Sequence, residues 1–144
     1  MIVAFEELGE LRGRVSMVDG GFDPLHAGHI AYFREAAALG LPVLCNLAPD
    51  AWVERKHPPL LPQDERAQVV DAIRFVDYVH VADGPTVDTL RALRPRYYVK
   101  GTDWRDRLPD EETEACRELG IEVVFLDTML GSSSELVERF ARAL

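Results

Sequence analysis

The sequence predicts an α/β fold, a Rossmann-like open sheet of five parallel strands with helices on both faces. Three observations favour this class. Short apolar runs, typical of buried strands, alternate with segments of helical periodicity five times along the chain. Gly, Pro and charged residues punctuate the alternation. The length of 144 residues suits one domain with a substantial core, so residues 1–144 are expected to form a single domain.

The predicted elements follow one another in a regular order. Strands are expected, as apolar runs, at residues 15–18, 41–47, 77–81, 97–100 and 121–126. Helices are expected, from apolar residues at turn spacing, at residues 30–39, 63–75, 86–93, 110–119 and 133–144. Gly40, Pro95 and Gly120 stand where helices should end, and Thr86 stands at an N-cap. Residues 1–14 are expected to be a short helix or an N-terminal extension, and residues 50–61 the longest loop.

Composition limits the classes of partner. The 16 basic and 25 acidic side chains give a formal charge of −9, which argues against a nucleic-acid partner because that class needs a basic face. A small anionic ligand is still compatible, since it needs only local donors. No apolar run is long enough for a membrane span, and acidic residues stand where a signal peptide carries bases. We therefore expect a cytoplasmic protein with no membrane partner, and expect Cys45 and Cys116 to be buried free thiols.

The unusual segments of the sequence all follow predicted strands. They are residues 19–29, 48–61, 100–107 and 128–134. In an open parallel sheet, ligands bind in the crevice outside the carboxyl ends of the strands. The functional site is therefore expected at this edge of the sheet.

The first of these segments reads DGGFDPLHAGHI over residues 19–30 and joins the first strand to the first helix. Its paired glycines allow a tight turn and a close approach of the backbone to a phosphate. If the helix starts near Ala27, His26 and His29 lie together at its first turn, where two imidazoles and free N–H groups face one anion. A zinc site is less favoured because the other two histidines lack metal-ligand spacing, so no metal site is predicted.

Residues 20–29, GGFDPLHAGH, resemble the G-x-F-D-x-x-H-x-G-H signature of the nucleotidyltransferase (cytidylyltransferase-like) superfamily. Further segments resemble the superfamily in order along the chain: DER at 64–66, IRFVDYV at 73–79, LRP at 93–95, VKGTDW at 99–104 and SSS at 132–134. The resemblance covers about residues 15–144. It is closest to the glycerol-3-phosphate cytidylyltransferases and to the adenylyltransferase domain of the ADP-heptose synthases.

This resemblance implies a nucleotidyltransferase. The implied reaction is a Mg²⁺-dependent attack of a substrate phosphate on the α-phosphate of ATP or CTP, with release of pyrophosphate. The implied acceptor is a phosphorylated sugar or polyol, and the implied assembly is a homodimer. The alternative is a non-catalytic nucleotide-binding regulatory module, because residues 127–131 lack the arginine that the glycerol-phosphate enzymes carry before the final serine/threonine run.

The resemblance also assigns roles to residues. The implied catalytic residues are His26, His29, Lys56 and Lys100, whose imidazoles donate to phosphate oxygens and whose ammonium groups offset phosphate charge. The implied nucleotide-binding residues are Gly20, Gly21, Phe22, Asp23, Gly28, Arg66, Gly101, Asp103, Ser132, Ser133 and Ser134.

Some of these residues have structural interpretations as well. Lys56 is either a lysine over the triphosphate or a solvated charge beside its charged neighbours. Arg66 opens a helix, which is the unfavourable end for a cation, so it either contacts a ligand or pairs with Asp64 or Asp71. The serine run caps the last helix and, in the relatives, also contacts the outer phosphates.

Overall fold

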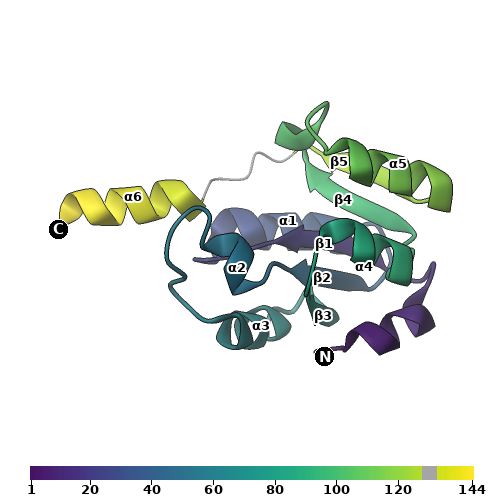
Figure 1. Cartoon of the computed structure of the whole chain (residues 1–144), viewed down its shortest axis with the longest axis horizontal. Coiled ribbons are helices and arrows are strands. Elements are labelled where there is room, and N and C mark those ends of the chain that lie inside the picture. Colours follow the sequence, from purple (N-terminus) through teal and green to yellow (C-terminus); the bar gives the residue numbers. More distant parts are fainter. Residues whose placement is uncertain (128–132) are drawn as a thin grey trace.

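The computed structural model describes residues 1–127 and 133–144. Its five strands form one all-parallel sheet in the order β3-β2-β1-β4-β5 (Figure 1). The strands are β1 (Ser16–Gly20), β2 (Val43–Leu47), β3 (Tyr78–Val81), β4 (Tyr97–Gly101) and β5 (Glu122–Leu126). Each strand overlaps its predicted range, and the predicted fold class is confirmed.

The helices alternate with the strands, as the sequence predicts. The α-helices of the described residues are α1 (Ala27–Ala37), α2 (Asp50–Val53), α3 (Gln63–Asp71), α4 (Thr86–Leu93), α5 (Asp110–Leu119) and α6 (Ser133–Ala143). Short 3-10 helices form at η1 (Phe5–Leu11) and η2 (Thr102–Trp104). Gly120 ends α5 in the left-handed conformation, as predicted for that position.

Both faces of the sheet are buried. Val18 faces a core that α1 and α3 complete with Phe33 and Val70. Its neighbour Met17 faces a second core, which α4 and η1 complete with Leu90 and Leu8. Because successive side chains of a strand point to opposite faces, one short apolar run contributes to both cores. Helices therefore cover both faces of the sheet.

The first residues of the chain pack more closely than an extension would. Val3 N donates to Val79 O at 2.8 Å and Val79 N donates to Met1 O at 2.9 Å, so residues 1–3 lie along the outer edge of β3. Leu8 in η1 is fully buried. The short helix expected here is confirmed, and the segment also covers a sheet edge that would otherwise be open.

Two predicted helix boundaries differ from the structure at the N-terminal end. The first helix begins at Ala27, not at residue 30, because the His26 side chain caps it. The N-cap of α4 is Pro85, not Thr86, and Thr86 is the first helical residue. The residues expected to form the longest loop, 50–61, include the short helix α2.

A third boundary differs at the C-terminal end of α3. This helix ends at Asp71, whereas helical periodicity predicts residue 75. The chain turns after residue 71 so that Asp77 N can donate to Val43 O at 2.9 Å, which starts the approach to β3. The tertiary hydrogen bond outweighs the local helical pattern.

The remaining expectations concern the thiols and the membrane. Cys45 and Cys116 are both free and buried, as predicted, and burial raises the pKa of Cys116 to about 11. In residues 1–127 and 133–144, no helix is both long and apolar enough to cross a bilayer.

Candidate active site

The turn after β1 is shaped by the packing of Phe22. A Cβ atom on Gly20 would lie 2.9 Å from Cζ of Phe22, so only glycine fits beneath this ring. Phe22 itself has a φ of 52°, and its ring packs edge-on against His29 and Phe33 with centroid distances of 4.8 and 5.1 Å. A strained, buried aromatic residue therefore links the glycine turn to the first turn of α1.

His26 and His29 cap α1 reciprocally. Gly28 N donates to Nδ1 of His26 at 3.1 Å, and His26 N donates to Nδ1 of His29 at 3.2 Å. The two imidazole rings are stacked, with centroids 3.8 Å apart. This is a capping box in which histidines take the places usually held by Ser or Thr and by Glu or Gln.

The capping bonds fix the tautomer of both imidazoles. Because each Nδ1 accepts a backbone N–H, the ring proton of each neutral imidazole is on Nε2. Burial, followed by the proximity of His26, lowers the pKa of His29 from 6.5 to about 3. Nε2 of His26 is buried and has no hydrogen-bond partner in the part of the chain that the structure describes. The site thus offers neutral N–H donors at fixed positions.

The backbone at the start of α1 differs from the expectation of free N–H groups. Besides the bonds to the imidazoles, the N–H groups of His29 and Ile30 donate to His26 O at 2.9 and 3.2 Å. The first turn therefore satisfies most of its own donors, including that of Gly28. The Nε2–H groups, not a run of backbone amides, are what remains for an anion.

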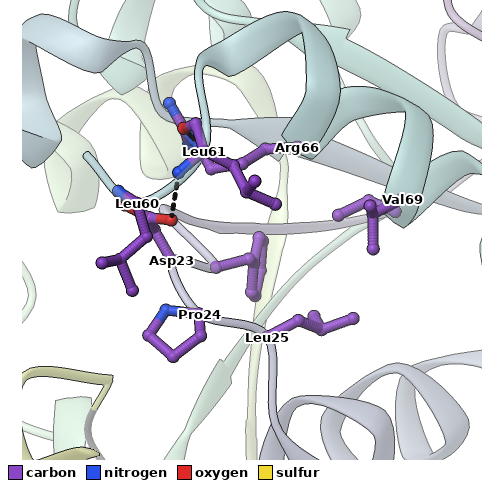
Figure 2. Close-up of a pocket in the computed structure, with 9 residues that line it drawn as sticks. Asp23, Pro24, Leu25, Leu60, Leu61, Arg66 and Val69 are labelled. Carbon is purple, nitrogen blue, oxygen red and sulfur yellow. Dashed lines mark hydrogen bonds between the residues drawn. The ribbon is translucent and has the colours of Figure 1, made fainter. Parts of the chain in front are cut away.

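Asp23 and Arg66 hold the loops around the signature. Asp23 is buried and accepts from Leu60 N at 2.7 Å and Leu61 N at 3.1 Å (Figure 2). Arg66 is 1% exposed and makes four hydrogen bonds, to Leu61 O, Gly21 O, Ala48 O and Oδ1 of Asp50. Its ion-pair partner is Asp50 at 2.7 Å, and the expectation of Asp64 or Asp71 is wrong. Most of the guanidinium is engaged within the protein.

A pocket of about 240 Å³ lies beside these two residues (Figure 2). Apart from Asp23 and Arg66, its lining consists of Phe22, Pro24, Leu25, Leu60, Leu61, Val69 and Val70. Neither histidine lines it. Its mostly apolar walls make it unsuited to phosphate.

Lys100 pairs with an acid at the carboxyl end of the neighbouring strand. Its Nζ donates to Oδ1 of Asp19 at 2.8 Å and lies 4.1 Å from the centroid of the Trp104 ring. The lysine is only 6% exposed. Asp19 directly precedes the glycine turn, so the ammonium group lies next to the signature.

Lys56 is exposed, and its Nζ lies 4.6 Å from the centroid of the Trp52 ring. Trp52 in turn lies close to the glycine turn, since a Cβ on Gly21 would be 3.5 Å from its Cζ3. The structure thus brings Lys56 to the edge of the signature without burying it. Whether it contacts a triphosphate stays a prediction.

The serine run contacts the signature from the other end of the chain. Oγ of Ser133 donates to Pro24 O at 2.8 Å and so attaches the start of α6 to the turn before α1, although α6 extends beyond the rest of the molecule (Figure 1). Ser134 occupies the next position of α6, and Ser132 lies outside the described residues.

Two further predicted nucleotide-binding residues lie in the segment that follows Lys100. Gly101 ends β4, and Asp103 is exposed in η2.

Sequence reasoning missed the acids that hold the two buried cations. Asp19 pairs with Lys100, and Asp50 pairs with Arg66. A signal for the first pair exists: β1 and β4 both end in a charged residue followed by glycine, and the register Met17↔Tyr98 carried two residues further sets Asp19 beside Lys100. No comparable signal marks Asp50, which lies in a segment expected to be a loop.

The family-model and relative comparisons agree on one family. The model of the cytidylyltransferase-like family matches residues 17–139. FAD synthase of Archaeoglobus fulgidus is 34% identical over 131 residues, which are 85% of this chain and 94% of that protein.

Other relatives are longer proteins. Bifunctional protein HldE of Wolinella succinogenes is 40% identical over 67% of this chain and 21% of its own length, and that of Azorhizobium caulinodans is 37% identical over 90% and 28%. The chain thus spans about a quarter of the length of these HldE proteins. Among solved structures, the lipopolysaccharide core biosynthesis protein from Thermoplasma volcanium has the same fold, with a TM-score of 0.66 at 24% identity over 82% of this chain and 98% of that one.

Proposed function

This chain belongs to the cytidylyltransferase-like family and is a nucleotidyltransferase, and we propose that it transfers AMP from the Mg²⁺ complex of ATP to a phosphorylated sugar. An oxygen of the sugar phosphate attacks the α-phosphorus of ATP. The bond from that phosphorus to the bridging oxygen of the β-phosphate breaks, and pyrophosphate leaves. Such a reaction needs positioning and charge stabilisation more than covalent help from the protein.

The observation that carries the proposal is the reciprocal cap of His26 and His29. Two imidazoles with their protons on Nε2 lie 3.8 Å apart, held by backbone bonds to their Nδ1 atoms. Preorganised neutral donors can bind phosphate oxygens as charge builds up in the transition state, without reorganising. The unpartnered, buried Nε2 of His26 is the position where a phosphate oxygen would complete the hydrogen bonding.

In the proposed reaction, Mg²⁺ binds as part of the MgATP substrate. Among the residues that the structure describes, no group of three or more His, Cys, Asp or Glu side chains could hold a metal ion. Mg²⁺ is commonly bound through substrate phosphates, water and one or two carboxylates, which is compatible with a site that has no such group. In this proposal Mg²⁺ arrives with the triphosphate, and the protein supplies imidazole and ammonium groups.

Three observations favour ATP over CTP. The relatives include an FAD synthase, whose name denotes a product with an adenylate half, and the sequence resembles the adenylyltransferase domain of ADP-heptose synthases. Residues 127–131 also lack the arginine of the glycerol-phosphate cytidylyltransferases. FMN is a second candidate acceptor, because the FAD synthase is matched over 94% of its length.

A panel of substrates tests the proposal. Pyrophosphate release is measured with ATP or CTP plus Mg²⁺, each with heptose 1-phosphate, glycerol 3-phosphate or FMN. We expect release with ATP and the sugar phosphate. Release with CTP and glycerol 3-phosphate alone would contradict the choice of nucleotide, and release with FMN would shift the acceptor to the second candidate. Nucleotide binding without release in any combination would favour the non-catalytic module.

A further inference from the structure

We propose that Asp19 is a positioning residue that holds the Lys100 ammonium group beside the glycine turn, where it meets the phosphates of the nucleotide. This inference rests on the proposed function, in which Lys100 contacts phosphate. Asp19 lies just before the family signature, which starts at Gly20, so the signature does not specify it.

The contacts of Lys100 define a single direction for its side chain. Oδ1 of Asp19 accepts from Nζ at 2.8 Å on one side, and the Trp104 ring lies 4.1 Å away on another. A free lysine side chain has many rotamers, and fixing them costs conformational entropy. In this protein the Lys100 side chain is already ordered before any ligand binds, because the Asp19 carboxylate and the Trp104 indole hold its ammonium group. The remaining N–H groups of the ammonium are left for an anion at the carboxyl end of the sheet.

Asp19 is itself fixed by a second contact, with Tyr98, on the same face of the sheet. Its Oδ2 is 2.9 Å from the hydroxyl of Tyr98, and that hydroxyl is also 2.6 Å from Oε1 of Glu112 in α5. The Tyr98 hydroxyl is the donor in both contacts, so its one proton is shared between two carboxyl oxygens that accept. Burial raises the pKa of Glu112. A chain of hydrogen bonds then runs from Glu112 through Tyr98 and Asp19 to Lys100.

The opposite charges of Asp19 and Lys100 support a positioning role for Asp19. A buried ammonium group without a counter-ion is strongly unfavourable, so the Asp19 carboxylate holds the Lys100 side chain in place while no nucleotide is bound. Asp19 reaches no phosphate itself, because a carboxylate repels it. Its effect on the reaction therefore passes through Lys100.

A double-mutant cycle tests this dependence. Asp19→Asn keeps the shape and removes the charge, Lys100→Met keeps the aliphatic stem and removes the ammonium, and the third variant combines both. Pyrophosphate release from MgATP in the presence of the sugar phosphate, and MgATP binding by calorimetry, are measured on the three variants and the unaltered protein. Thermal unfolding confirms that each is folded, and the double variant avoids an unpaired buried charge.

The cycle has a definite expected result. Each single substitution should lower kcat about tenfold or more, and Lys100→Met should weaken MgATP binding by a similar factor. Asp19→Asn should cause no further change, within about twofold, when Lys100 is already Met. Additive losses, or an Asp19→Asn variant with unchanged kcat and affinity, would overturn the proposal. If the unaltered protein binds MgATP but releases no pyrophosphate, the proposed function fails while the binding cycle still decides the role of Asp19.

Discussion

At the scale of single residues, the site depends on which nitrogen of each imidazole carries the proton. Nδ1 of His26 and Nδ1 of His29 each accept a backbone N–H, so Nδ1 has a structural role in each side chain, and Nε2 is the atom that we propose as the donor to phosphate. Substitutions that keep the first and remove the second can therefore separate stability from activity. Asparagine does this, because its Oδ1 can take the place of Nδ1 as an acceptor.

The first prediction concerns His26. His26→Asn should keep the N-cap and leave the free energy of unfolding within about 0.5 kcal/mol, whereas His26→Ala should lower it by about 1 kcal/mol. Both variants lose the Nε2 donor, and both should lose roughly 10²–10³ in kcat. Urea unfolding and pyrophosphate release measure the two effects. Near-normal turnover by His26→Asn would mean that Nε2 has no part in the reaction.

The second prediction follows from the pKa of His29, which is lowered from 6.5 to about 3. Below about pH 6.5 the unfolded chain binds a proton that the folded protein does not bind until about pH 3, so stability falls as the pH drops through this range. This one residue should remove roughly 2 kcal/mol between pH 6.5 and about 4.5. Urea unfolding of His29→Asn at the same pH values is the control. The variant should show a weaker pH dependence, and equal dependence in both proteins would refute the burial effect.

At the scale of elements, Arg66 connects the turn after β1 with the segment that follows β2. From α3 it reaches the glycine turn through Gly21 O, the end of β2 through Ala48 O, and α2 through Asp50. The family signature alone cannot form this arrangement, because the turn after β1 is attached to segments that follow β2. Arg66 is therefore expected to act on the site through the loops it holds.

The third prediction concerns this connection. Arg66→Met leaves three carbonyl groups and Asp50 without their partner, so it should destabilise the protein by about 3 kcal/mol or more. Asp50→Asn removes only the ion pair of a partly exposed carboxylate and should cost about 1 kcal/mol. Chemical unfolding of the two variants checks the order. If Arg66→Met unfolds at the same denaturant concentration as the unaltered protein while losing nucleotide affinity, Arg66 is a ligand contact instead.

The elements were predictable from sequence to different degrees. The strands and α5 follow their apolar patterns, since the sheet is buried on both faces and Gly120 stops the helix. The end of α3 was not predictable from its periodicity, because the chain leaves the helix after Asp71 and reaches β3, where Asp77 N donates to Val43 O. The caps by His26 and His29 were also missed, since histidine is not a common capping residue.

At the scale of the whole molecule, the order β3-β2-β1-β4-β5 puts β1 at the centre of the sheet with β2 and β4 beside it. The segments after these three strands therefore meet at one edge, and the predicted site residues His26, Arg66 and Lys100 contact the same turn or its neighbours. The partner of Arg66 was not predictable, because Asp50 lies in a segment expected to be a loop. The pairing of Asp19 with Lys100 can be inferred once β1 and β4 are known to be neighbours.

The most direct test of nucleotidyl transfer follows the α-phosphorus of ATP. ATP labelled at the α-phosphate is incubated with Mg²⁺, the sugar phosphate and the protein, and the products are separated. We predict that the label moves into a nucleotide-diphosphate-linked product, with one pyrophosphate released for each product formed, and that His26→Asn reduces both together. Formation of labelled ADP, or label that stays in ATP while the nucleotide binds, would contradict nucleotidyl transfer by this site.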